Sequence, residues 1–151
     1  MVIRKRILAL DIGTKRIGSA ISDALWLGAT PLKLIERKNN KIALEEIEKL
    51  CNEYNTDTIL IGIPYNMDGT LGFQAKDCLD FIKPLKNKYI ILEQDERLSS
   101  NTAEEILKQK GKKYTKNKGL VDITAACIIL NEYLENKRLG KNERTKYYAN
   151  Y

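Results

Sequence analysis

Three acidic residues of this sequence stand where a carboxylate is costly to bury unless it has a partner. Asp11 directly follows the apolar run ILAL, Glu96 lies at the end of the run YIILEQDE, and Asp122 lies among apolar residues with helical spacing. For any one acid alone, a buried salt bridge is the simpler interpretation, for example between Asp122 and Arg97, or a helix N-cap role for Asp122. The partner that each acid needs is therefore a Lys, an Arg or a metal ion.

Histidine is absent from the 151 residues, and this narrows the possible chemistry. Its absence excludes nucleophile activation by Ser-His-Asp or Cys-His pairs and metal sites that depend on histidine ligands. Cys51, Cys78 and Cys127 are widely spaced without a C-x-x-C pair, so neither a disulfide framework nor a zinc site is indicated. Carboxylates without imidazole favour hard ions such as Mg²⁺ or Mn²⁺.

The chain has a net charge of +6, and its basic residues are concentrated in the last third. Six lysines fall within residues 108–118, which contain no acid. A run of charge is usually a solvated surface, and this remains the simpler interpretation for residues 137–151. Residues 108–118 lie between two helical patterns, so we predict a mobile basic loop there, which suits binding to a phosphate backbone.

Apolar periodicity predicts the elements that position the three acids. A hairpin over about residues 7–22 turns at Gly13 and puts Asp11 at the end of its first strand. This order of elements predicts an α/β fold with a mixed five-stranded sheet and helices on both faces. The remaining strands are predicted at 30–37, 58–63 and 89–96, and the helices at about 40–54, 75–85, 102–110 and 120–137.

We predict one domain over residues 1–138, followed by a basic C-terminal tail over 139–151 whose order the sequence leaves open. The start of the chain has too few apolar residues for a signal peptide. The apolar run ITAACIIL at 123–130 falls far short of the roughly 20 residues that a membrane span needs. We therefore expect a cytoplasmic protein with no membrane partner.

Four motifs together carry a specific resemblance. The D-x-G-T of residues 11–14 also occurs in actin-like ATPases and sugar kinases, but their nucleotide cleft needs two such domains, and this chain is too short for a second. The set ALDIGTKRIGSAISD, IGIPYNMDGTLG, DERLSS and KGLVDITAACIILNEYL closely resembles the YqgF/RuvX family of Holliday junction resolvase-like nucleases, over about residues 7–134. The resemblance implies an RNase H-like fold, a divalent-metal nuclease site and maturation of the 5′ end of pre-16S rRNA.

The resemblance also implies roles for individual residues. The family's acids correspond to Asp11, Glu96 and Asp122, which would act as the catalytic carboxylates and hold two Mg²⁺ or Mn²⁺ ions. Asp95 and Asp68 are the alternatives to Glu96 at this position, although Asp68-Gly69 also fits a plain turn. The candidates for contacts with substrate phosphates are Thr14, Lys15, Arg16, Arg97, Lys112, Lys113, Lys116 and Lys118.

Several alternatives stay open at this point. The nucleic acid that is cut could be a ribosomal RNA precursor or a branched DNA such as a Holliday junction, because the motifs do not distinguish them. The same fold could also serve as a non-catalytic RNA-binding factor in ribosome assembly or transcription. Ribosomal particles are a possible partner, and the sequence fits either a monomer or the homodimer that junction cleavage would need.

Overall fold

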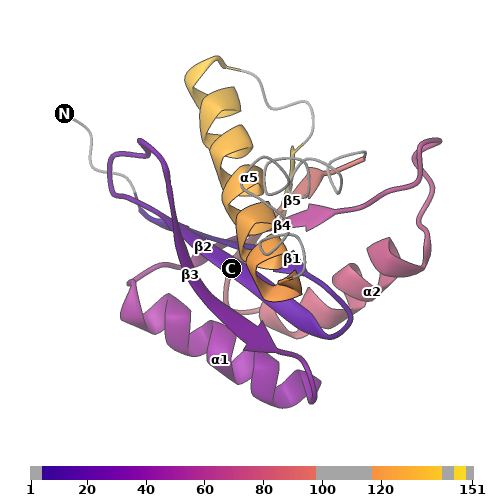
Figure 1. Cartoon of the computed structure of the whole chain (residues 1–151). Helices are drawn as coiled ribbons and strands as arrows, with labels where there is room; N and C mark the ends of the chain where they lie inside the picture. The colour runs from indigo at the N-terminus through magenta and orange to yellow at the C-terminus, as the bar shows by residue number, and fades with distance from the viewer. Residues whose placement is uncertain (1–4, 98–116, 141–144, 149–151) are drawn as a thin grey trace.

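The structure is a computed structural model, and it describes residues 5–97, 117–140 and 145–148. The predicted helix at 102–110 and the predicted loop lysines Lys112, Lys113 and Lys116 lie outside the described residues. The chain forms one sheet with the strand order β3-β2-β1-β4-β5-β6 (Figure 1). Its elements are β1 (Ile7–Ile12), β2 (Arg16–Ser22), β3 (Ala29–Glu36), α1 (Asn40–Glu53), β4 (Thr58–Ile63), α2 (Phe73–Ile82), the short 3-10 helix η1 (Lys83–Leu85), β5 (Ile90–Asp95), α5 (Lys118–Arg138) and β6 (Thr145–Tyr148).

The sheet is mixed, as predicted. The strands β1, β2 and β3 form an antiparallel meander, whereas β4 pairs with β1 and β5 pairs with β4 in parallel. All five predicted strands are present. The structure adds a sixth, β6, which pairs antiparallel with β5 inside the segment predicted as a tail. Thr145 and two tyrosines favour a strand there, a local preference that the basic charge of the segment obscured.

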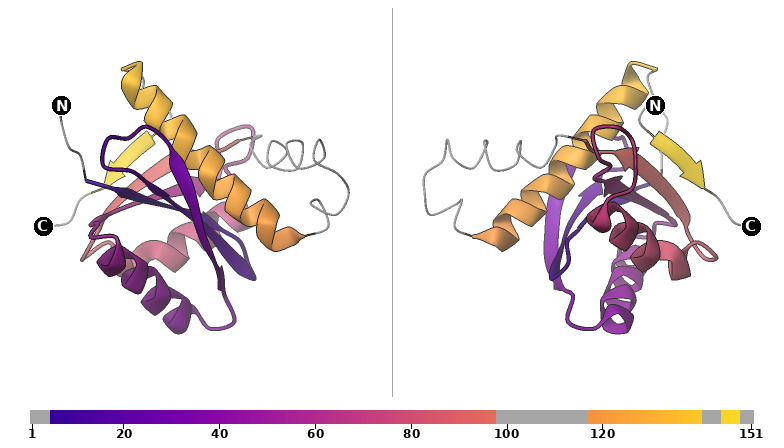
Figure 2. Two further views of the ribbon diagram at one scale, coloured as in Figure 1. Left: turned by 60° about the vertical axis from the view of Figure 1, so that its left-hand side comes forward. Right: turned by 90° about the vertical axis from the view of Figure 1, so that its right-hand side faces the viewer.

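Helices cover both faces of the sheet and bury two separate cores (Figure 2). The helices α1 and α2 pack on one face, against residues such as Leu8, Leu10 and Ile61. The longer helix α5 packs on the other face, against residues such as Ala9 and Leu60. Alternate residues of each central strand thus point to opposite cores, which explains the nearly continuous apolar runs of β1 and β4.

Asparagine side chains cap two of these helices. Asn39 accepts hydrogen bonds from the backbone N–H groups of Lys41 and Ile42 at the start of α1. Asn117 accepts from the N–H of Leu120 and caps α5. Asp122 therefore lies inside the second turn of α5, and its predicted alternative role as an N-cap is wrong.

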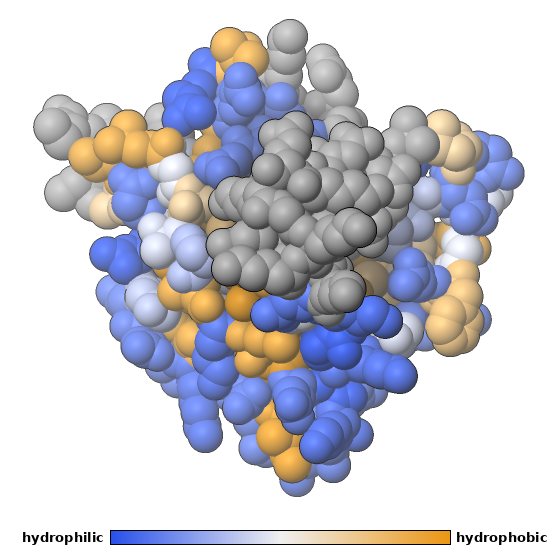
Figure 3. Space-filling model, viewed as in Figure 1, coloured by the Kyte–Doolittle hydropathy of each residue, from blue (hydrophilic) through white to orange (hydrophobic). Residues whose placement is uncertain are grey.

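Exposed apolar side chains gather in the loop between β4 and α2 and at the first residue of α2. Met67, Leu71 and Phe73 are 63%, 51% and 81% exposed. Figure 3 shows apolar atoms at the right-hand edge of the molecule, where this loop lies in Figure 1, while the surface over α1 is mostly hydrophilic. Within the described ranges, no helix has the length and apolar character that crossing a bilayer requires.

Candidate active site

The three predicted acids come from three different elements and converge on the α5 side of the sheet. Along β1, Ile7 and Ala9 belong to the core under α5, so Asp11 faces α5 by alternation. Glu96 follows β5 and is buried, with 4% of its surface exposed. Its backbone N–H donates to the carbonyl of Ile63, which keeps the residue in the sheet's register. Asp122 lies on α5 itself.

The pKa of Asp11 is shifted by burial and by the charges of the other two acids. Burial, together with the charges of Asp122 and Glu96, raises the pKa of Asp11 from 3.8 to about 7. Burial also raises the pKa of Asp122, while hydrogen bonding and charge from Arg16, and charge from Lys118, oppose the rise. Negative charge therefore accumulates at this end of the sheet, and Asp11 lies within electrostatic range of both other acids.

Two glycines make room around Asp11. Gly18 pairs with Asp11 across β1 and β2, and a Cβ at Gly18 would lie 2.1 Å from the carbonyl oxygen of Asp122. On β4, a Cβ at Gly62 would lie 2.9 Å from the Cγ of Glu96 and 2.7 Å from a methyl carbon of Ile129. Only glycine allows α5 to lie this close to β2 and the Glu96 side chain to lie over β4.

Protein groups hold two of the three carboxylates in this structure. The Nε of Arg16 donates to Oδ2 of Asp122 at 3.2 Å, and the Nε2 of Gln94 donates to Oε1 of Glu96 at 3.0 Å. Gln94 also donates to the carbonyl of Ile129 on α5, so it links β5 to that helix. Among the residues that the structure describes, no three acidic, His or Cys side chains form a group that would hold an ion as they stand.

The donor chemistry nevertheless fits a hard divalent ion. All three side chains offer carboxylate oxygens, which Mg²⁺ and Mn²⁺ prefer. Burial and the like charges of Asp122 and Glu96 raise the pKa of Asp11, so a divalent ion would supply a compensating positive charge. An ion that bound Oδ2 of Asp122 would compete with Arg16 for that oxygen.

Asp95 and Asp68, the predicted alternatives to Glu96, contact other groups. Asp95 lies on the α1 and α2 side of β5 by alternation, and its Oδ2 is 2.9 Å from the Nε of Arg97. The predicted pairing of Asp122 with Arg97 is therefore wrong, because Arg16 takes that place. Asp68 accepts hydrogen bonds from the N–H and hydroxyl of Thr70, which is the turn chemistry weighed for it. Of the two consecutive acids Asp95 and Glu96, Glu96 is the one that faces α5.

Several predicted phosphate-contacting residues border the acids. Thr14 and Lys15 are exposed in the turn between β1 and β2, which the hydrogen bond from the Gly13 N–H to the Arg16 carbonyl closes at 2.9 Å. Lys118 begins α5 and is close enough to influence Asp122. Arg97 lies farther out, where it also donates to the carbonyl of Met67.

Arg37 anchors the same turn and was not predicted. Its guanidinium forms a two-point ion pair with Asp77 of α2, at 2.6 and 2.9 Å, and donates to the carbonyl of Gly13 at 2.9 Å. It also lies over the ring of Phe81, 4.4 Å from its centroid, and its side chain is only 6% exposed. No motif distinguishes this arginine from the other basic residues, because its partners lie 24 and 40 residues away.

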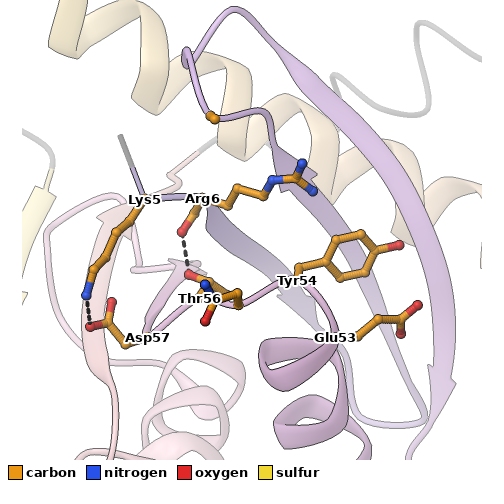
Figure 4. Close-up of a pocket in the computed structure, with 8 residues that line it drawn as sticks. Lys5, Arg6, Glu53, Tyr54, Thr56 and Asp57 are labelled. Atoms are coloured by element: carbon orange, nitrogen blue, oxygen red, sulfur yellow. Dashed lines mark hydrogen bonds and ion pairs between the residues drawn. The ribbon is translucent and has the colours of Figure 1, made fainter. Parts of the chain in front are cut away.

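The larger of two hollows described in the structure lies away from the acids. It has a volume of about 820 Å³ and lies where β1 and β4 begin, at the opposite end of these strands from Asp11. Figure 4 shows Arg6 and Tyr54 extending into it and Lys5 paired with Asp57 at 2.7 Å. A second hollow of about 500 Å³ lies beside α2. Neither hollow contains a predicted catalytic residue.

Comparison with known proteins identifies the relatives of this chain. The family model RuvX, described as Holliday junction resolvase, matches residues 5–136. A "Putative pre-16S rRNA nuclease" of Crocosphaera subtropica is 46% identical over 138 residues, which cover 87% of this chain and 93% of the relative. A protein of the same name from Clostridium acetobutylicum is 40% identical over 133 residues, covering 87% of this chain and 98% of the relative.

Solved structures support the RNase H-like fold. Thermus thermophilus RuvC in complex with a Holliday junction substrate matches with a TM-score of 0.55 at 12% identity, covering 95% of this chain and 99% of RuvC. The fowlpox virus resolvase in complex with Holliday junction DNA also matches with a TM-score of 0.55, at 16% identity, covering 87% of this chain and 98% of the resolvase. At these identities the likeness concerns the fold.

Proposed function

Because this chain belongs to the RuvX family of Holliday junction resolvase-like nucleases, we propose that it is a divalent-metal-dependent endonuclease that processes the 5′ end of pre-16S rRNA. The relatives at 40% and 46% identity bear the name of that activity. This substrate implies a cytoplasmic protein that meets ribosomal precursor particles. RNA cleavage is compatible with a monomer and with a homodimer.

Asp11, Glu96 and Asp122 are the residues that would hold Mg²⁺ or Mn²⁺. A pair of such ions supplies activation of a water molecule and stabilisation of the leaving oxygen. The chain supplies rigid placement of the carboxylates, because β1, β5 and α5 belong to the two packed cores. Gly18 lets the Asp122 backbone of α5 lie close to β2, and Gly62 lets the Glu96 side chain lie over β4.

One observation supports this proposal most directly: the pKa of Asp11 is raised to about 7 by burial and by two neighbouring acids. A fold that concentrates three carboxylates in this way loses stability unless a cation or proton neutralises them. A purely structural role would favour a closed salt bridge for each acid. A perturbed acid beside two others is instead typical of a functional site.

The basic residues around the acids suit contacts with the phosphates on either side of the cut. Thr14, Lys15 and Arg16 occupy the β1–β2 turn and the start of β2, and Lys118 the start of α5. Arg97 would add to these contacts, and Lys112, Lys113 and Lys116, which the sequence predicts in a basic loop, are further candidates. Backbone contacts of this kind carry little sequence information, so the shape of the RNA would select the substrate.

Branched DNA is the second candidate substrate. The family description and the two fold neighbours with Holliday junction ligands favour it. Junction cleavage requires two sites in one assembly, so it predicts a stable homodimer.

Cleavage by the Asp11→Asn variant tests the proposal. The change keeps the shape of the side chain and removes a charge that binds metal, so cleavage of a pre-16S fragment with Mg²⁺ should fall by more than about a hundredfold. Asp57→Asn is the matched control, because Asp57 pairs with Lys5 at the opposite end of β4. It should cleave at the wild-type rate.

Four-way junction DNA and the RNA fragment should be assayed side by side. Faster cleavage of the junction, together with a dimer in solution, would favour the second substrate. Equal activity of Asp11→Asn and wild type, with contaminating nucleases excluded, would leave only the non-catalytic RNA-binding role.

A further inference from the structure

We propose that Arg16 is a positioning residue that alternates between two anions: the Asp122 carboxylate before an ion binds, and a substrate phosphate afterwards. This inference rests on the proposed metal-dependent function and adds to it a role for a single side chain. Arg16 would keep Asp122 oriented toward the sheet while no ion is bound. Ion binding would then release its guanidinium toward the scissile strand.

The contact between Arg16 and Asp122 is the first step of the argument. Nε of Arg16 lies 3.2 Å from Oδ2 of Asp122, and the two side chains are 32% and 22% exposed. The contact joins the start of β2 to the second turn of α5. A positive group therefore already occupies an oxygen that the proposed site needs for an ion.

An ion that binds Oδ2 of Asp122 would displace this guanidinium, and an ion on the second oxygen of the same carboxylate would repel it. Two cations at contact distances of one oxygen repel each other strongly, and the repulsion is larger in a partly buried site. Of the three acids, Arg16 contacts Asp122, whereas an ion placed among them would be attracted by Asp11 and Glu96 as well as by Asp122. Arg16 is therefore the group that must move.

Comparison with Arg37 shows which arginine is free to move. Arg37 holds Asp77 through two nitrogens, at 2.6 and 2.9 Å, contacts Phe81, and is 6% exposed. Arg16 holds Asp122 through one nitrogen at 3.2 Å and is about a third exposed. A two-point, buried pair is a fixed structural element, whereas a one-point, partly exposed pair exchanges partners at little cost.

The position of Arg16 suits its second partner. It directly follows Thr14 and Lys15, which are exposed in the turn. Arg16 and Lys118 are both close enough to Asp122 to influence its pKa. Its guanidinium keeps a fork of donors that matches two phosphate oxygens. Glu36, which pairs with Arg16 across β2 and β3, is the competing destination, although its carboxylate already lies 3.4 Å from Lys38.

Nuclear magnetic resonance of the arginine Nε–H groups tests the exchange directly. Mg²⁺ alone is added to the full-length protein, with the Arg16 signal assigned from its loss in Arg16→Lys. We expect the Arg16 signal to shift and to exchange faster with water as it leaves Asp122. Arg37 is the internal control, because its Nε donates to Asn40 and should not respond.

The Arg16→Gln variant provides the second measurement. Without the competing guanidinium, Mg²⁺ should bind about two- to fivefold more tightly, the range expected for loss of a partly exposed ion pair. Binding of single-stranded RNA in the presence of Ca²⁺ should weaken. Lys118→Gln removes the same charge near Asp122 without freeing Oδ2, so its gain in Mg²⁺ affinity should be smaller.

The outcomes separate this inference from the proposed function. If Mg²⁺ binds but the Arg16 signal stays unchanged and Arg16→Gln binds Mg²⁺ as wild type does, the Arg16 inference is wrong and the proposed metal site stands. If Arg16 moves but RNA affinity is unaffected in Arg16→Gln, Glu36 is its destination and the phosphate role is wrong. If Mg²⁺ does not bind at all, both proposals are overturned.

Discussion

The backbone of α5 at Asp122 lies directly over Gly18 of β2, at the position that pairs with Asp11. A methyl group at Gly18 would be 2.1 Å from the Asp122 carbonyl oxygen, so the helix must move away to accept it. We predict that Gly18→Ala costs roughly 1–3 kcal/mol of unfolding free energy through overpacking. Displacement of Asp122 should also weaken Mn²⁺ binding and slow cleavage. Denaturant unfolding and titration calorimetry measure these effects.

Gly28→Ala is the control for this prediction. Its Cβ would meet only the Asn131 Oδ1 of the same helix, at the ordinary contact distance of 3.9 Å. The control should unfold within about 0.5 kcal/mol of wild type, as surface substitutions usually do. Equal stability and metal affinity in Gly18→Ala would mean that α5 tolerates a shift without loss of the site.

Stability of the ion-free protein should fall as the pH rises through the range in which Asp11 titrates. The pKa of Asp11 rises from 3.8 to about 7 on folding, so the folded state holds an extra proton between those values. Unfolding free energy therefore decreases with pH in that window. Asp11→Asn removes this dependence and should melt a few degrees higher than wild type at pH 8 without metal. Thermal melts of wild type and Asp11→Asn from pH 4 to pH 8 test this. If the melting temperatures of both proteins change equally with pH, the prediction is wrong.

Metal affinity should show the opposite dependence on pH. Below the Asp11 pKa of about 7, an ion must displace a proton from that carboxylate, so Mn²⁺ affinity should rise about tenfold per pH unit and level off above pH 7. Calorimetry in two buffers of different ionisation enthalpy counts the proton that is released. A flat profile between pH 5 and pH 7 would show that the ion does not contact Asp11.

Breaking the buried pair of Arg37 with Asp77 should destabilise the protein and loosen the β1–β2 turn. Arg37→Ala leaves a partly buried acid unpaired and frees the Gly13 carbonyl, so we expect a loss of about 3 kcal/mol. Cleavage should slow because Thr14 loses its fixed position. Lys38→Ala is the control: its pair with Glu36 is exposed, and its loss should cost under about 0.5 kcal/mol.

The lysines of residues 108–118 should carry much of the salt dependence of nucleic-acid binding. Each phosphate contact contributes about −0.9 to the slope of log affinity against log salt for duplex DNA and about −0.7 for single strands. Changing Lys112, Lys113 and Lys116 to Gln should therefore flatten the slope by about two units and weaken binding. The charge-matched control replaces three basic residues before and within α1: Lys38, Lys41 and Lys49. Equal slopes in both variants would assign the effect to net charge.

The sequence was sufficient to predict the parts of the fold and site that depend on local pattern. Apolar runs and their alternation located five strands and placed Asp11 at a strand end. The family resemblance pointed to Glu96 and left Asp95 as an alternative, and the structure places Glu96 on the α5 side, where it pairs with Gln94. Turn chemistry accounted for Asp68.

Features that depend on long-range packing could not be predicted. The partner of Asp122 is Arg16, 106 residues away, rather than Arg97. Both arginines fit the charge requirement, and only the placement of α5 over β2 decides between them. The anchor formed by Arg37 likewise depends on partners 24 and 40 residues away, and the pairing of β6 with β5 joins segments far apart in the chain.

The pairing of β6 with β5 has a practical consequence for truncated forms of the protein. Residue 138 ends α5 and looks like a natural place to stop the chain. Shortening it there would remove β6 and leave β5 as an open edge, with unpaired backbone groups beside the buried Gln94. Open edges of this kind recruit strands from other molecules, so the shortened protein should self-associate through the strand that leads to Glu96.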